Sequence, residues 1–222
     1  DAAGNTNTTS GATSPSLTID MVAPTVVVST DKPSGVKAGE VAKLTFTLSE
    51  AAAQAGDFSS ADVVVTGGSL SGFGGSGTVY TALFTPTDNA VGTSTALVGV
   101  VGSGFADAAG NANAASTLLS FAMDTVRPTV SLSSSVTALN ASTSTALISI
   151  TLSEASTDFA VGDLNPVGGG LSGFGGSGTN YTVLFTPTAN ATTGSVSVSG
   201  GSFSDAAGNT NTTSGATSPS LT

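Results

Sequence analysis

The chain repeats itself with a period of about one hundred residues. Asp-Ala-Ala-Gly-Asn occurs at 1–5, 107–111 and 205–209, and residues 205–222 repeat residues 1–18 letter for letter. A period of this length is the size of one small domain, so each copy predicts the same corner of a repeated unit. We expect the tail of a preceding repeat at residues 1–19, one repeat at 20–123 and a second at 124–222.

Apolar and polar residues alternate within each repeat. Every second position is apolar between residues 42 and 48 and again between 146 and 152, which is the pattern of a half-buried strand. Abundant Gly, Ser, Thr, Ala and Val oppose helices and favour short strands. The sequence therefore predicts an all-β fold of tandem immunoglobulin-like β-sandwich domains, with about seven strands each. Further strands of the first repeat are expected at 26–28, 63–65, 80–84, 98–100 and 119–123.

The glycine-rich stretch 67–77 has the composition of a phosphate-binding loop, but no helical pattern and no lysine follows it. We interpret it as a hairpin or bulge region with Phe73 turned into the core. The most apolar run, 95–106, is interrupted by glycines and is too short to span a bilayer. We therefore expect a soluble piece of a longer array, without membrane insertion.

The composition excludes much chemistry. The chain has no Cys and no His, which removes disulfides, thiolate and imidazole metal sites and nearly all pairs of nucleophile and base. Fourteen acidic residues against four basic ones give a formal net charge of −10, which argues against a nucleic-acid partner. We expect no enzyme activity. What remains for a site is carboxylates, amides, hydroxyls and backbone carbonyls.

Most of the acidic residues are predicted to meet at one end of each domain. In an immunoglobulin-type sandwich, the start of the first strand, the loop after the second strand and the loop between the last two strands lie at the same pole. Acids of the opposite pole, Asp31 or Asp88 with Asn89, could reach the junction between the repeats. The first pole gathers Asp20, Glu50, Asp57, Asp62, Asp107 and Asn111; the second gathers Asp124, Glu154, Asp158, Asp163, Asp205 and Asn209.

Such clusters of carboxylates repel one another unless a cation neutralises them. Oxygen ligands without His or Cys select Ca²⁺, whose 6 to 8 oxygen ligands suit several loop-borne donors better than the strict octahedron of Mg²⁺. We expect Ca²⁺ as the cofactor. The predicted ligands are Asp20, Glu50, Asp62, Asp107, Asn111, Asp124, Glu154, Asp163, Asp205 and Asn209, with Asp57, Asp158 and Asp88 as secondary candidates.

Several of these residues have a purely structural alternative. Asp107 and Asn111 could serve only to shape the turn around Gly110. Asp62 and Asp163 directly precede apolar strands, so a role in starting those strands competes with a ligand role. Glu50 and Glu154 are better ligand candidates, because Glu is scarce here and both follow an alternating strand.

The two repeats differ at their poles. Arg127 stands where the first repeat has Ala23, so a salt bridge could replace part of the second calcium site. The loop that follows the glutamate is three residues longer in the first repeat, so the poles need not bind the same number of ions. The copy of the motif at Asp1 is separated from its own domain and should be the weakest or emptiest site.

An ordered series of motifs carries a family resemblance. Leu-Ser-Glu-Ala at 48–51, Gly-Ser-Leu-Ser-Gly-Phe at 68–73, Phe-Thr-Pro-Thr at 84–87 and Phe-Ala-Asp-Ala-Ala-Gly-Asn at 105–111 have counterparts in the second repeat. Taken together, they resemble the bacterial immunoglobulin-like repeats of giant secreted adhesins of the RTX or biofilm type. The resemblance implies calcium-stiffened extracellular stalks that hold an adhesive tip away from the cell.

The resulting hypothesis is structural. We expect an extender repeat of a bacterial cell-surface adhesin, located outside the cell and rigidified by calcium at the poles between domains. Its partners would be neighbouring repeats of the same chain. Two alternatives stay open: a ligand-binding adhesion module that uses threonine-rich strand faces, and a subunit of an extracellular filament in which residues 1–19 are donated as a strand to an identical chain.

Overall fold

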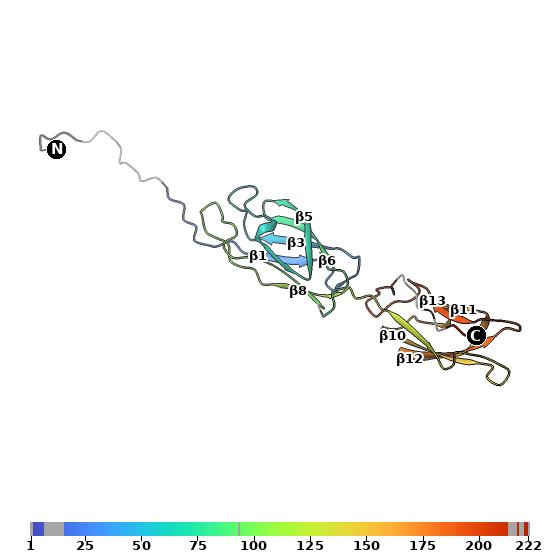
Figure 1. Cartoon of the computed structure of the whole chain (residues 1–222). Helices are drawn as coiled ribbons and strands as arrows, with labels where there is room; N and C mark the ends of the chain where they lie inside the picture. The colour runs from blue at the N-terminus through green and yellow to red at the C-terminus, as the bar shows by residue number, and fades with distance from the viewer. Residues whose placement is uncertain (1, 7–15, 93, 213–216, 218–219, 222) are drawn as a thin grey trace.

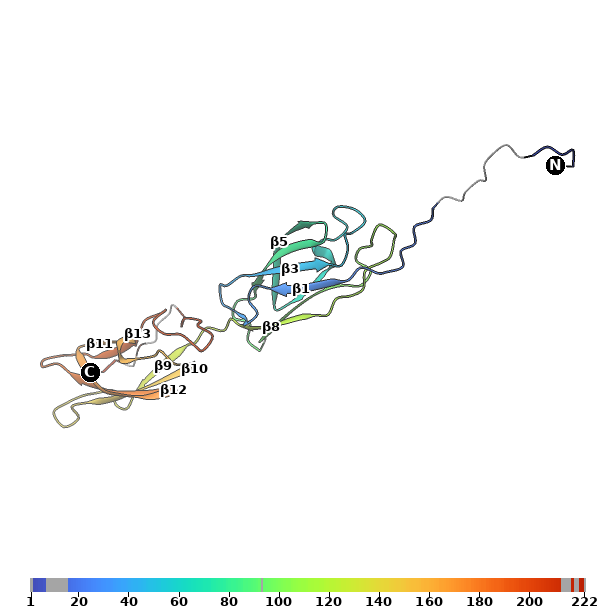
Figure 2. The same ribbon diagram turned by 180° about the vertical axis from the view of Figure 1, so that it is seen from behind.

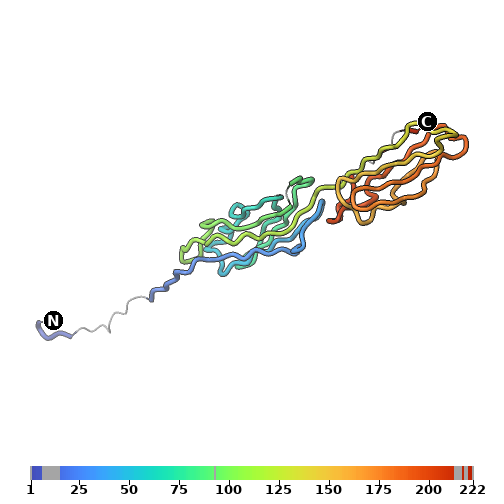
Figure 3. Tube along the Cα trace, turned by 90° about the horizontal axis from the view of Figure 1, so that it is seen from below, coloured from blue at the N-terminus to red at the C-terminus, as the bar shows by residue number. Residues whose placement is uncertain are grey.

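The computed structural model describes residues 2–6, 16–92, 94–212, 217, 220 and 221. They form two β-sandwich domains that follow one another along a common axis (Figures 1 and 2). The Cα trace in Figure 3 shows the same end-to-end arrangement from below. Among the described residues, no helix has the length and apolar character needed to cross a membrane. The all-β fold of tandem β-sandwich domains predicted from the sequence is confirmed.

In the described part of the chain, domain one has two four-stranded sheets, ordered β1-β3-β6-β5 and β2-β8-β7-β4. The strand pairs are antiparallel except for β2 and β8, which run parallel. A short 3-10 turn, η1 (Ser60–Asp62), precedes β4. The strands are β1 (Val26–Thr30), β2 (Val36–Lys37), β3 (Ala42–Leu48), β4 (Val63–Thr66), β5 (Gly68–Ser76), β6 (Val79–Pro86), β7 (Thr95–Val100) and β8 (Leu119–Asp124).

Aromatic residues fill the core between the sheets of domain one. Strand β3 turns its apolar side chains inward and its polar ones outward, as its period of two predicts. Phe58, from the loop before η1, lies 5.0 Å from Tyr80 and 5.1 Å from Phe105 between ring centroids. Aromatic contacts of this kind add to the free energy of burial. The core thereby ties the loop after β3 and the loop after β7 to the sheets.

The glycine-rich stretch is a strand. Residues 68–76 form β5, which pairs with β6 across a register shift between Ser71 and Gly74. Phe73, in this irregular region, packs against Phe46 with a centroid distance of 5.7 Å. The interpretation as a hairpin and bulge region is therefore confirmed. The sequence did not predict that the stretch adds a complete strand, nor the two-residue strand β2.

Domain two repeats this plan with five described strands, in sheets ordered β12-β10-β9 and β11-β13. Strand β12 covers in one run the residues that correspond to β5 and β6. Isolated bridges from Gly194 to Leu221 and from Ser197 to Thr217 place the last described residues beside β13, much as β8 lies beside β7. The elements are β9 (Val130–Ser134), β10 (Ala146–Ser156), η2 (Val161–Asp163), β11 (Leu164–Val167), β12 (Gly169–Pro187) and β13 (Ser195–Val198).

The described residues 16–25, which lead into domain one, contain no strand. Leu17, Ile19 and Met21 are 83%, 82% and 85% exposed, although they alternate as strand residues would. The donation of this segment to another molecule stays a prediction. Asp1, the predicted weakest site, lies outside the described residues.

Candidate cation centres

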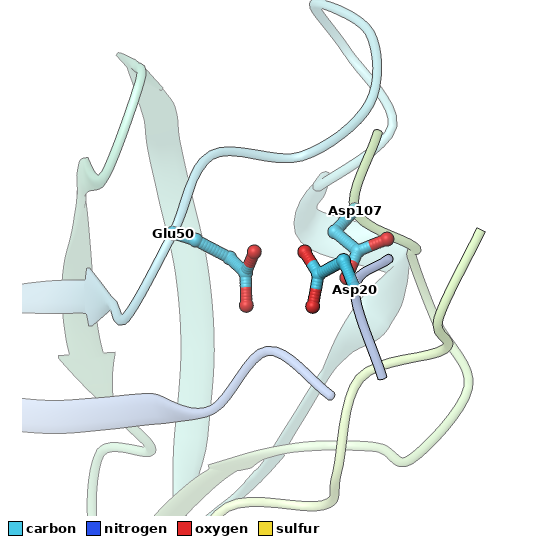
Figure 4. A group of neighbouring side chains, drawn as sticks. All are labelled: Asp20, Glu50 and Asp107. Atoms are coloured by element: carbon cyan, nitrogen blue, oxygen red, sulfur yellow. The ribbon is translucent and has the colours of Figure 1, made fainter. Parts of the chain in front are cut away.

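Three separate segments bring carboxylates together at the N-terminal pole of domain one. Asp20 precedes β1, Glu50 follows β3 and Asp107 lies in the loop after β7. One carboxylate oxygen from each lies within 4.8 Å of the others, and Figure 4 shows the three side chains converging. We call this group the domain-one centre.

Domain two holds the equivalent group, which we call the domain-two centre. Asp124, Glu154 and Asp205 also place carboxylate oxygens within 4.8 Å of one another. Asp124 is the last residue of β8, so one member of this centre lies where the last strand of domain one leads into domain two. The convergence that sandwich topology predicted for these acids is present in both domains.

The Asp-Ala-Ala-Gly-Asn loop holds its aspartate rigidly. The backbone N–H groups of Ala109 and Asn111 each donate to Oδ1 of Asp107 at 2.9 Å, and Gly110 has a φ of +91°, which glycine adopts without strain. The turn-forming role considered for Asp107 is therefore real. It is compatible with a ligand role, since the same bonds orient the carboxylate toward Glu50 and Asp20.

The asparagine at the end of this loop positions the acids. Asn111 donates from Nδ2 to Oδ2 of Asp107 at 2.8 Å and to the backbone carbonyl of Asp20 at 3.2 Å. In domain two, Asn209 makes the same bonds to Asp205 at 2.9 Å and to the carbonyl of Asp124 at 3.2 Å. An amide nitrogen carries no lone pair for a cation, so this geometry differs from the ligand role predicted for Asn111 and Asn209.

The acids of each centre differ in their electrostatics. Burial, and then the charges of Asp107 and Asp20, raise the pKa of Glu50. The same causes act on Glu154: burial first, then Asp205 and Asp124, raise its pKa. By contrast, the hydrogen bond from Asn111 outweighs burial and lowers the pKa of Asp107. In each centre, therefore, the charged form of the glutamate is disfavoured unless a counterion is present.

The contacts of Glu154 leave part of its carboxylate without a partner. Its Oε1 is buried and has no hydrogen-bond partner among the described residues. Glu154 and Asp124 line an open cavity of about 610 Å³ beside the junction, and Arg127 lies on its wall. Arg127 forms no ion pair with a described carboxylate. Among the described residues, the ion pair that is present joins Lys32 and Glu40 at 3.7 Å. The salt bridge suggested for Arg127 is therefore not formed.

Two of the predicted ligands cap local turns and lie outside both centres. Oδ2 of Asp62 accepts the backbone N–H of Ser59 at 2.8 Å, which closes the capping box of η1. Oδ2 of Asp163 accepts the backbone N–H of Ala160 at 2.8 Å at the start of η2. Their carboxylates turn back to their own backbone and lie outside both three-carboxylate groups, and the ligand role of these two acids stays a prediction.

The secondary candidates also lie outside both centres. Asp57 accepts the backbone N–H of Gln54 at 2.9 Å, and Asp158 accepts the hydroxyl of Ser156 at 2.7 Å and the backbone N–H of Ser204 at 2.9 Å. These bonds hold loops together. At the opposite pole, Asp88 is exposed, and Asp31 accepts the backbone N–H of Lys43 at 2.7 Å. Asn89 contacts the linker through its backbone N–H, which donates to the Thr125 carbonyl at 3.2 Å.

Sequence reasoning missed the residues of domain one that contact the domain-two centre. The ammonium of Lys37 donates to the carbonyl of Gly208 at 2.9 Å, and the backbone N–H of Ala38 donates to Oδ1 of Asn209 at 2.8 Å. Thr125 in the linker is 1% exposed, and its hydroxyl donates to the carbonyl of Thr87 at 2.8 Å. The scarcity of lysine was the one available signal for Lys37. A backbone donor such as the N–H of Ala38 leaves no signal in the sequence.

Comparison with known families decides the classification. The model of a family described as bacterial Ig-like domain matches residues 20–123 and again residues 124–221. The chain belongs to this family. Both centres thus lie at the N-terminal poles of bacterial Ig-like domains in tandem. A search of curated proteins finds no match.

Two solved structures have a distant resemblance to this pair of bacterial Ig-like domains. The I9-I11 tandem of titin has a TM-score of 0.36 and 9% identity, over 88% of this chain and 65% of the titin chain. The adhesin InvE of Yersinia pseudotuberculosis has a TM-score of 0.31 and 14% identity, over 87% of this chain and 58% of the adhesin chain. The bacterial Ig-like domains described here thus span less than two thirds of either structure.

Proposed function

We propose that this chain is an extender segment of a bacterial cell-surface adhesin of the giant secreted type, stiffened by calcium at the N-terminal pole of each domain. The observation that carries the proposal is the recurrence of the three-carboxylate centre at the same pole of both domains. Membership in the bacterial Ig-like family supports a structural role at the cell surface or outside the cell. In this proposal the partners are neighbouring repeats of the same chain.

The chemistry of the centres favours a hard cation. Each centre combines three carboxylates, and the enclosed Oε1 of Glu154 has no described donor. Three carboxylates can offer up to six oxygens, which is within the range that Ca²⁺ accepts at flexible loop sites. Extracellular calcium modules typically bind at about 10⁻⁴ to 10⁻³ M, so millimolar calcium outside a cell would fill such sites.

The position of the domain-two centre links ion binding to stiffness. Asp124 ends β8, a strand of the domain-one sheets, at the boundary between the two repeats, whereas Glu154 and Asp205 lie within domain two. A cation shared by the three would hold the linker against domain two and restrict bending between the domains. An array built in this way would stay extended under load.

Calcium removal tests the proposal. If calcium is present at about ten times its dissociation constant, linkage predicts roughly 1.4 kcal/mol of added stability per site. For a domain of this size, that corresponds to a rise in melting temperature of roughly 5 to 10 °C. The measurement is melting of the chain in a chelator, in calcium and in magnesium. An unchanged melting temperature in calcium, together with no binding heat in calorimetry, would sink the proposal.

A further inference from the structure

Domain one reaches the domain-two centre through one tight turn. The backbone N–H of Glu40 donates to the carbonyl of Lys37 at 3.1 Å, and Gly39 has a φ of +77°. These features make residues 37–40 a type II turn with Ala38 at its second position. The N–H of Ala38 is not used inside the turn, and it donates to Oδ1 of Asn209 across the junction. We call residues 37–40 the docking turn.

A single amide connects the docking turn to the acids. Oδ1 of Asn209 accepts from Ala38, while Nδ2 of Asn209 donates to Asp205 and to the carbonyl of Asp124. Because the amide group is planar, a bond that orients one end also orients the other. Two of the three acids of the domain-two centre are therefore held by a side chain that domain one fixes.

The domain-one centre provides an internal comparison. Asn111 makes the same two bonds to Asp107 and to the carbonyl of Asp20, at 2.8 and 3.2 Å. Asn111 is partly exposed, whereas Asn209 is only 2% exposed at the junction. The same local motif is thus buried and in contact with the docking turn in the domain-two centre, and more open in the domain-one centre.

We propose that the docking turn regulates the domain-two centre, so that contact with domain one raises its calcium affinity above that of the domain-one centre. This inference rests on the proposed function, since it names what controls one of the calcium sites. A pre-oriented Asn209 removes part of the ordering cost that the cation would otherwise meet at Asp124 and Asp205. Linkage makes the effect reciprocal, so calcium must strengthen the contact between the docking turn and Asn209 by the same factor.

The residue for the test is Ala38 rather than Lys37. The Lys37 ammonium repels a cation, while its bond to Gly208 favours docking, so its replacement would change two effects of opposite sign. Proline is favoured at the second position of a type II turn, and Lys37 before it is in the extended conformation that proline requires. Ala38→Pro therefore removes the donor and keeps the turn.

The experiment is calcium titration by calorimetry. In chains carrying Glu50→Gln, which disables the domain-one centre, Ala38→Pro should weaken binding about three- to tenfold, the effect of losing one hydrogen bond. Ala38→Ser keeps the N–H and should bind like its parent. In chains carrying Glu154→Gln, the remaining domain-one centre should bind equally with and without the Ala38→Pro change, which also verifies that domain one is folded.

Amide exchange tests the reciprocal effect. In the unmodified chain, saturation with calcium should slow exchange of the Ala38 N–H by the same three- to tenfold factor. Equal calcium affinity in the Ala38→Pro and Ala38→Ser chains, or exchange at Ala38 that calcium leaves unchanged, would overturn the inference. Absence of calcium binding in every chain would contradict the proposed function instead, so the two failures are distinguishable.

Discussion

Asn209 donates its side-chain amide to Oδ2 of Asp205 at 2.9 Å, and both residues are buried. The equivalent bond from Asn111 to Asp107 measures 2.8 Å and is the main cause of the lowered pKa of Asp107. A carboxylate that accepts such a bond stays ionised although it is enclosed. In domain one the asparagine therefore keeps Asp107 charged and oriented before any cation arrives, and in domain two the equivalent bond orients Asp205.

Asn209→Ala should destabilise domain two more than Asn111→Ala destabilises domain one. The first change removes the side-chain donor to the buried Oδ2 of Asp205 and to the Asp124 carbonyl, at a cost of about 1 to 3 kcal/mol in the free energy of unfolding. Water can replace the more exposed Asn111, so its loss should cost less. Urea unfolding in a chelator, followed through amide signals of each domain, measures both values. Equal losses would contradict this difference in burial.

The effect of Glu154→Gln on the melting temperature should disappear in acid and should change sign with calcium. The folded-state pKa of Glu154 lies above its ordinary value of 4.5. Its contribution to stability is therefore complete below pH 4.5 and is lost as the pH rises through the folded-state pKa. Without calcium at neutral pH, Glu154→Gln should raise the melting temperature, and this gain should vanish in acid. With saturating calcium the variant should melt lower than the parent, because it lacks a ligand.

Asp88→Asn is the matched control for that experiment. Asp88 is exposed and lies outside both centres, so its replacement removes the same formal charge without relieving a crowded carboxylate. The melting temperature of this variant should follow the parent at each pH, with and without calcium. A Glu154→Gln chain that is destabilised in chelator at neutral pH would show that its carboxylate is not strained in the ion-free centre.

Much of the fold followed from period and topology. The alternation at 42–48 identified β3, and the sandwich connectivity brought Asp20, Glu50 and Asp107 to one pole. Strand β2 was not predictable, because two residues carry no periodic signal. Its Lys37 and the adjoining Ala38 contact domain two only because of how the domains are placed, which no local pattern records.

The ligand set was harder to predict than the pole. Asp62 and Asp163 were themselves predicted as ligands, yet their carboxylates turn back to Ser59 and Ala160. Whether an aspartate caps its own turn or points toward a pole depends on its side-chain rotamer, which position in the sequence does not determine. The number of acids at a pole therefore overestimates the number in the centre.

Asp62→Ala and Glu50→Gln should separate structural acids from ligands. Loss of the capping box by Asp62→Ala should lower the stability of domain one by about 0.5 to 2 kcal/mol in chelator, while calcium binding persists. Glu50→Gln should abolish or strongly weaken calcium binding at the domain-one centre without a comparable loss of ion-free stability. Calorimetry and urea unfolding on the same two chains give both readings. Calcium binding that fails in Asp62→Ala would return Asp62 to the ligand set.

Gly75→Ala should destabilise domain one, whereas Gly74→Ala should not. Gly75 has a φ of +155°, and a Cβ there would lie 2.3 Å from the carbonyl oxygen of Val79 and 2.5 Å from Cα of Tyr80. A Cβ at Gly74 would meet nothing within 4 Å. The contacts of Gly75 should cost about 1 to 3 kcal/mol or force the β5–β6 register to slip. Thermal unfolding of the two variants measures the difference.

The Gly74→Ala and Gly75→Ala variants also test why the glycine-rich stretch forms a strand. Phe73 stacks on Tyr80 with a centroid distance of 5.9 Å, so a slipped register would withdraw Phe73 from the core. Gly176, the counterpart in domain two, would place a Cβ 2.3 Å from the carbonyl oxygen of Asn180, so Gly176→Ala should repeat the effect there. Equal stability of the Gly74→Ala and Gly75→Ala chains would mean that the close approach of the backbone does not require glycine at position 75. The many glycines of this stretch would then serve chain flexibility instead.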